Sequence, residues 1–91
     1  MRTIPRRDKF KIYGDLLSAL YYHSSAEKIV LTQIQVEINA PFDRLKTYIR
    51  DVKDLGLIQD EASLKLTEKG IQYLRMYKKV LDFLKRMGLE Y

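Results

Sequence analysis

The sequence predicts a mainly α-helical fold with one small β-hairpin, and three observations lead to this. Apolar residues recur at steps of three and four along three long stretches, which is typical of helices that bury one face. Two short apolar stretches flank a polar segment near residue 60, which is typical of a hairpin. The chain has 91 residues and no cysteine, so it has room for one domain and cannot form a disulfide.

The first helix is expected over residues 8–23. Ser24 and Ser25 weaken the helix, and residues 25–28 make a polar connection. The apolar run at residues 29–31 then predicts one short edge strand. The helix has a single apolar stripe, formed by Phe10, Tyr13, Leu16, Leu17, Leu20 and Tyr21.

Residues 32–38 leave two alternatives open. Apolar and polar residues alternate here, which favours a strand. Leu31, Ile34 and Ile38 also fit one face of a helix, for which Thr32 would be the N-cap. The local pattern alone favours the strand.

The second long helix is expected over residues 41–55. Pro41 has the φ angle that a first helical turn needs, and Gly56 is a typical residue after a helix end. The opposite face is mostly charged, so the helix is amphipathic. Its apolar stripe consists of Phe42, Leu45, Tyr48, Ile49, Val52 and Leu55.

The remaining elements are a hairpin and a long last helix. Residues 57–58 and 64–66 predict two short strands around the polar segment 59–63. Thr67 is expected as the N-cap of a helix that runs to about Met87. Two neighbouring helices followed by a hairpin form the winged helix-turn-helix arrangement, in which the helix before the wing is the candidate DNA-reading element.

The charge of the chain suggests a polyanionic partner. Lys and Arg number 17 against 12 Asp and Glu, which gives a net charge of +5. The excess lies at the two ends, because residues 1–25 carry five basic and two acidic groups and residues 67–91 carry six and three. Residues 26–66 carry six basic and seven acidic groups. The basic N-terminal arm, residues 1–7, is therefore a candidate for phosphate contacts.

Three pieces of the chain carry a family resemblance: Asn39-Ala-Pro-Phe-Asp-Arg-Leu-Lys-Thr-Tyr-Ile49, Leu55-Gly-Leu-Ile58, and Leu66-Thr-Glu-Lys-Gly70 followed by Tyr73-Leu74. Together they resemble small archaeal winged-helix DNA-binding proteins, of the ten-kilodalton crenarchaeal chromatin and regulator type. The resemblance covers roughly residues 31–77. It implies that residues 32–39 form the second helix of the motif. It also implies double-stranded DNA binding, and pairing through the last helix as an antiparallel coiled coil. The core side chains it implies are Phe42, Leu45, Tyr48 and Ile49.

Four side chains of helix 41–55 are the candidates for DNA contact. Arg44 and Thr47 lie one turn apart in its N-terminal half, where side chains reach base edges. Arg can hold guanine with two hydrogen bonds, and Thr can meet a thymine methyl group. Lys46 and Arg50 are better placed for phosphates.

The N-terminal arm adds Arg6 and Arg7 as candidate phosphate contacts. The alternative for helix 41–55 is an ordinary solvated face with ion pairs such as Arg50–Asp54. The acidic tip of the expected wing, residues 59–61, favours a winged-helix protein-interaction module that binds no DNA.

The last helix has two apolar stripes, and a monomer needs only one for its core. An exposed apolar stripe usually marks an interface, so the second predicts a homodimer. The stripe taken as the dimer interface is Tyr73, Met76, Val80, Phe83 and Met87. The other stripe is Ile71, Leu74, Tyr77, Leu81 and Leu84.

Catalysis and metal binding are not expected. His23 has no cysteine or carboxylate cluster near it in the sequence, and no HExxH, P-loop or GxGxxG spacing occurs. We therefore expect no enzyme activity, no metal and no cofactor. No apolar run approaches the roughly 20 residues that span a bilayer, so we expect a cytoplasmic, nucleoid-associated protein without a membrane partner.

These observations predict a dimeric double-stranded DNA-binding protein that regulates transcription and reads the major groove with helix 41–55. Residues 1–7 would be a basic arm, 8–66 the winged helix-turn-helix and 67–91 the dimerisation helix. One alternative is a winged-helix protein-interaction module that pairs but binds no DNA. Another is a chromatin protein without sequence preference.

Overall fold

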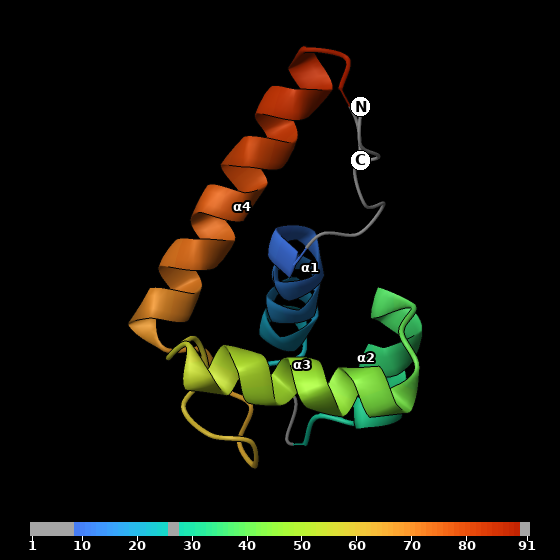
Figure 1. Cartoon of the computed structure of the whole chain (residues 1–91). Helices are drawn as coiled ribbons and strands as arrows, with labels where there is room; N and C mark the ends of the chain where they lie inside the picture. The colour runs from blue at the N-terminus through green and yellow to red at the C-terminus, as the bar shows by residue number, and fades with distance from the viewer. Residues whose placement is uncertain (1–8, 26–27, 90–91) are drawn as a thin grey trace.

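α1 (Lys9–Tyr22) is the central element because its apolar residues cover more than one side of the helix. The computed structural model describes residues 9–25 and 28–89, and within these ranges α1 contacts each of the three other helices. These are α2 (Leu31–Ile38), α3 (Phe42–Asp54) and α4 (Glu68–Arg86). α2 and α3 pack on one side of α1 and α4 rises along another (Figure 1). The buried residues of α1 are Ile12, Tyr13, Gly14, Leu16, Leu17, Ala19 and Leu20.

α2 corrects two sequence predictions, the edge strand at residues 29–31 and the strand at residues 32–38. Ile34 and Ile38 are buried, as one face of a helix requires, whereas Val36 is 77% exposed. The alternation of apolar and polar residues therefore arises because Val36 lies on the surface of a helix. It does not indicate a β-strand. The N-cap is Val30 and not Thr32, and Asn39 ends the helix in the left-handed conformation. The helix implied by the family resemblance is correct.

α3 follows the predicted stripe with two exceptions, Phe42 and Leu55, of which Leu55 is the C-cap and 47% exposed. Leu45, Ile49 and Val52 are buried. Phe42, expected in the core, is 40% exposed, because it lies in the first turn at the edge of the buried face. Pro41 is the N-cap and not a residue of the first turn.

The predicted β-hairpin is wrong, since the described residues contain no strand or sheet. Only Ile58 and Leu66 form an isolated antiparallel bridge. This bridge belongs to the segment here called the α3–α4 loop (residues 55–67), and the backbone hydrogen bonds from Gln59 N–H to Lys65 O and from Thr67 N–H to Leu57 O flank it. Leu64 has a φ of 58° and its side chain is buried, so the loop turns inward to the core at this point. The described residues therefore form four helices, and a compact loop joins α3 to α4.

α4 begins as predicted, because the Thr67 hydroxyl accepts a hydrogen bond from the Gly70 N–H at 3.0 Å. The same hydroxyl donates to the Gly56 carbonyl at 2.6 Å, which joins the start of α4 to the end of α3. Leu74 and Tyr77 then pack on the core. No residue in the range 78–89 is buried, although Leu81 still packs on the edge of the core, so most of the second half of α4 is open to solvent.

Candidate nucleic-acid interface

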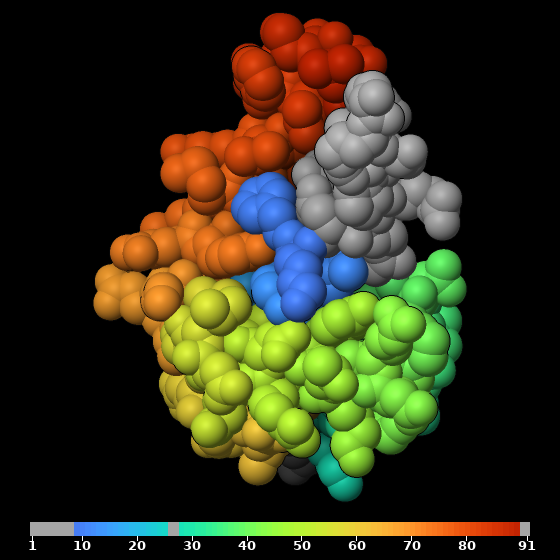
Figure 2. Space-filling model, in the orientation of Figure 1, coloured from blue at the N-terminus to red at the C-terminus, as the bar shows by residue number. Residues whose placement is uncertain are grey.

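The four α3 residues predicted to contact DNA all lie on its exposed side. Arg44, Lys46, Thr47 and Arg50 are exposed, and the buried stripe of the same helix faces the core. In Figure 2 the yellow-green surface of α3 occupies the lower front of the molecule, with no other described helix in front of it. The structure therefore leaves all four side chains exposed on the open side of α3.

A buried tyrosine of α1 holds α3 against α1. The Tyr13 hydroxyl donates a hydrogen bond to the Asp51 carboxylate at 2.8 Å, and the Tyr13 ring meets Tyr48 edge-on at 6.3 Å between centroids. Burial, together with the hydrogen bond to Asp51, raises the pKa of Tyr13 to about 12. Asp51 therefore points to α1 and away from the open face of α3.

The open face of α3 is more basic than the sequence of the helix suggests. With Asp51 turned to α1, its exposed charged side chains are four basic and two acidic. Within residues 9–25 and 28–89, no ion pair joins Arg50 to Asp54 or involves any other α3 side chain. The intrahelical ion pairs of the solvated-face alternative are thus not formed. The exposed charged residues are Asp43, Arg44, Lys46, Arg50, Lys53 and Asp54.

Two contacts along α3 fix side chains of this face. The Lys46 ammonium lies over the Phe42 ring at 5.8 Å from its centroid. The Thr47 hydroxyl donates back to the Asp43 carbonyl at 3.3 Å. The hydroxyl of Thr47 is therefore already used, and its methyl group is the part left for contact with a base.

The acidic tip of the α3–α4 loop has a structural explanation. The Asp60 carboxylate accepts hydrogen bonds from the N–H groups of Ala62 at 2.9 Å and Ser63 at 2.6 Å. The hydrogen bond from Ser63 is the main cause that lowers the pKa of Asp60, and Lys53 contributes. Asp60 thus holds the turn of the loop. Its presence there does not argue against DNA binding by α3.

The α4 residues predicted for the dimer interface divide into two groups. Tyr73 packs within the chain, because its hydroxyl donates to the Phe10 carbonyl at 2.9 Å and its ring lies 5.5 Å from that of Phe10. Val80 is half-buried. The other three, Met76, Phe83 and Met87, are each 56% exposed. Arg6 and Arg7, predicted to contact phosphates, lie outside the described residues.

One polar contact was not foreseen from the sequence. His23 lies 2.7 Å from Glu37, which joins the end of α1 to α2. The two residues are 14 positions apart, so only the packing of α2 on α1 brings them together. No local pattern in the sequence signals this pair.

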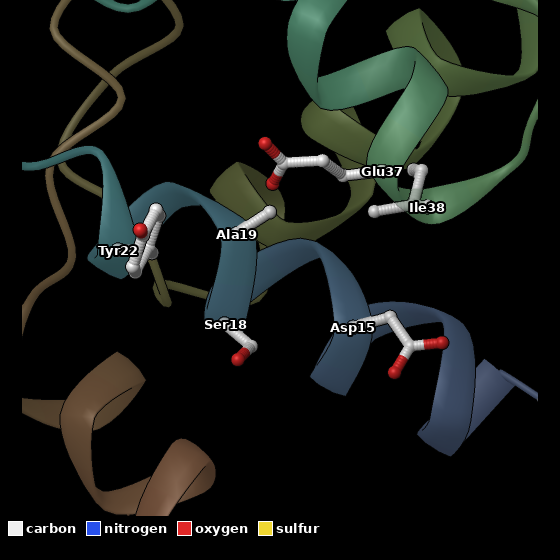
Figure 3. Close-up of a pocket in the computed structure, with 6 residues that line it drawn as sticks. All are labelled: Asp15, Ser18, Ala19, Tyr22, Glu37 and Ile38. Atoms are coloured by element: carbon white, nitrogen blue, oxygen red, sulfur yellow. The ribbon is translucent and has the colours of Figure 1, made fainter.

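A hollow of about 370 Å³ lies between α1 and α2 close to this pair. Figure 3 shows Glu37 and Asp15 at separate places along it, with their carboxylates pointing in different directions. Asp15 is engaged by the Tyr77 hydroxyl at 2.6 Å and by Lys11 at 3.3 Å. No cluster of three metal-binding side chains occurs in the part of the chain that the structure describes. The two carboxylates of this hollow are therefore not part of such a cluster.

None of the helices in the described ranges has the length and apolarity to cross a bilayer.

Comparison with known proteins assigns the family. A sequence model described as winged helix-turn-helix matches residues 6–85, which includes α1, α2, α3, the α3–α4 loop and all of α4 except its last residue. No curated protein and no solved structure matches the chain significantly. Winged helix-turn-helix domains are typically DNA-binding modules and not enzymes, and α3 occupies the place of the recognition helix. The chain belongs to the winged helix-turn-helix family.

Proposed function

We propose that this protein binds double-stranded DNA as a homodimer and reads the major groove with α3. The observation that carries the proposal is the open face of α3, where four basic side chains stand without ion-pair partners among the described residues. Family membership suggests DNA binding in the same way. The recognition helix of such domains enters the major groove with its N-terminal residues next to the bases.

The side chains of α3 have separate roles in this proposal. Arg44 and Thr47 lie nearest the bases, where Arg pairs with guanine and the methyl group of Thr47 meets a thymine methyl. Lys46 and Arg50 contact phosphates, and the contact of Lys46 with the Phe42 ring holds it in place. Arg6 and Arg7, in the arm of residues 1–7, add phosphate contacts.

α4 supplies the dimer interface of the proposal. Met76, Phe83 and Met87 form an exposed apolar strip that runs from the middle of α4 to its C-cap, with half-buried Val80 between Met76 and Phe83. An exposed strip of this kind commonly marks a protein–protein contact. Residues 67–91 would then join two copies of the domain at residues 8–66, and fix the distance between two DNA half-sites.

The cellular role follows from these proposals. A dimer with two recognition helices fits a transcriptional regulator that works in the cytoplasm on the nucleoid. The resemblance of residues 31–77 to crenarchaeal chromatin and regulator proteins supports the same role.

Paired substitutions on α3 test the function. We expect Arg44→Ala to relax selectivity at one base position by about 1–3 kcal/mol, because it removes a base contact. Lys46→Ala is expected to weaken binding to all duplexes alike, because it removes a phosphate contact. Gel shifts on a set of duplexes with single base changes measure both effects.

Lys85→Ala is the matched control, since it removes one exposed charge from the far end of α4. It is expected to leave DNA binding nearly unchanged. A complete lack of shift at about 50 mM salt would instead favour a protein-interaction module that pairs through α4.

A further inference from the structure

The first turn of α3 contains a carboxylate to which the proposed function assigns no role. Asp43 is the second residue of the helix and is exposed. Spacings of four and seven residues place it in one line with Thr47 and Arg50 along the outer face of α3. Asp43 thus lies in the N-terminal part of the recognition helix, from which side chains reach base edges.

The Asp43 carboxylate has no ion pair or hydrogen bond within residues 9–25 and 28–89. Its neighbour one turn on, Lys46, has its ammonium over the Phe42 ring. The hydroxyl of Thr47 donates to the main-chain carbonyl of Asp43 and not to its side chain. The carboxylate therefore remains available as a hydrogen-bond acceptor on a face that is otherwise basic.

A free acidic group at this place has a clear consequence for DNA binding. A carboxylate is repelled by phosphates and by hydrogen-bond acceptors on the base edges. The affinity is therefore lower for every sequence that places an acceptor opposite the carboxylate. The N4 amino group of cytosine is a donor in the major groove, and Asp accepts hydrogen bonds from it. Adenine also offers an amino group, but its N7 acceptor lies beside it and would repel the second carboxylate oxygen.

From this we infer that Asp43 is a specificity-determining residue that selects a C·G base pair at one fixed position of each half-site. The inference rests on the proposed function, since it needs α3 to lie in the major groove. It makes the protein a sequence-selective DNA reader, because a general DNA-coating protein has no use for an acceptor that penalises most sequences.

Three substitutions, compared with the unmodified full-length chain, test the inference. Binding sites are selected from random duplexes, and dissociation constants are then measured for the selected duplex and for versions with each other base at the selected position. The unmodified protein is expected to prefer cytosine there by about tenfold. Asp43→Asn and Asp43→Ala are expected to lose this preference and to bind unselected duplexes several-fold more tightly, because a repelled charge is gone.

Asp54→Asn is the matched control. It removes the same charge from the outer face of the same helix, 11 residues further on, or roughly 16 Å along the axis. It is expected to keep the preference for cytosine. The thermal midpoints of all variants show whether they are folded, and Asp43→Asn should lose a few degrees at most through the helix dipole.

The outcomes separate the two proposals. Duplex binding without a cytosine preference, or a preference that survives Asp43→Ala, overturns the role of Asp43 and leaves DNA binding by α3 intact. A preference lost equally in Asp54→Asn also overturns it, because the effect would then be one of net charge. Absence of any duplex binding at about 50 mM salt overturns both proposals together.

Discussion

At the scale of single residues, the contact between Tyr13 and Asp51 determines which side of α3 faces α1. It ties the helix to α1 and removes one acidic group from the open face. The hydrogen bond requires a protonated tyrosine, and burial favours the same neutral form. The packing of α3 on α1 is therefore sensitive to alkaline pH.

The raised pKa of Tyr13 predicts a loss of stability between about pH 10 and pH 12. Below pH 10 the tyrosine is neutral in both the folded and the unfolded chain, and its contribution is complete. As the pH rises from the unfolded pKa of 10.0 to the folded value of about 12, only the unfolded chain releases the proton, so folding is disfavoured. The expected loss is at most about 2–3 kcal/mol.

Chemical denaturation of the unmodified chain and of Tyr13→Phe, at several pH values, measures this loss. Tyr13→Phe is expected to be about 1 kcal/mol less stable at pH 7, because it lacks the hydrogen bond to Asp51. The difference between the two proteins should shrink above pH 10. Parallel curves up to pH 12 would contradict the role given to burial of Tyr13.

The exposed charged residues of α3 could be predicted from the sequence, whereas side-chain contacts between different helices could not. The amphipathic stripe places Arg44 and Arg50 on the surface because helical periodicity is a local property. The contacts of His23 with Glu37 and of Tyr13 with Asp51 join positions far apart in the chain. These contacts depend on how the helices pack against one another. The local sequence around each residue does not indicate its partner.

At the scale of elements, the junction between the α3–α4 loop and α4 is closely packed. A Cβ atom at Gly70 would fall on the main-chain carbonyl oxygen of Leu57 and lie 3.3 Å from the Cβ of Leu66. The Thr67 N–H also donates to the Leu57 carbonyl, at 3.0 Å. The start of α4 is thus packed directly on the loop backbone.

Gly70→Ala is therefore expected to destabilise the fold by about 1–3 kcal/mol, although alanine favours helix more than glycine does. The backbone carbonyl cannot move aside without breaking its hydrogen bond to Thr67. Thermal unfolding followed by circular dichroism measures the effect. Gln72→Ala, at an exposed position two residues on, is the control, and it should leave the midpoint nearly unchanged. A Gly70→Ala protein as stable as the parent would contradict this packing.

Element types were predictable where the periodicity is long and failed where it is short. α1, α3 and α4 carry apolar stripes over three or more turns, and the structure confirms all three helices. α2 has eight residues, so the exposed Val36 was enough to imitate a strand. The hairpin prediction was wrong because Leu57, Ile58 and Leu64 are buried in a helical core and do not belong to a sheet.

At the scale of the whole molecule, α4 has two functions along its length. Its first half closes the core through Leu74 and Tyr77, with the Tyr77 ring so near α1 that a Cβ at Gly14 would lie 2.5 Å from it. Its second half has no buried residue. Such a helix is stable when another copy covers the exposed apolar strip, which is the basis for the proposed dimer.

Phe83→Glu is expected to convert the dimer to monomers at micromolar concentration. Each copy would lose about 1.5–3 kcal/mol of apolar burial, and two like charges would meet across the interface. Sedimentation velocity measures the change, and circular dichroism should show an unchanged fold because Phe83 is 56% exposed. Lys85→Glu is the control, with a charge change on the side of α4 away from Phe83. A monomeric unmodified chain at this concentration would refute the dimer.

DNA binding through α3 is the central claim, and the salt dependence of duplex affinity tests it most directly. Fluorescence anisotropy with a labelled duplex, between about 50 and 200 mM salt, gives the slope of log affinity against log salt. We predict measurable binding, and a slope that becomes shallower by roughly 0.9 in each of Lys46→Ala and Arg50→Ala, since each removes one phosphate contact. No binding at the lowest salt, or the same slope in all three proteins, would contradict the claim.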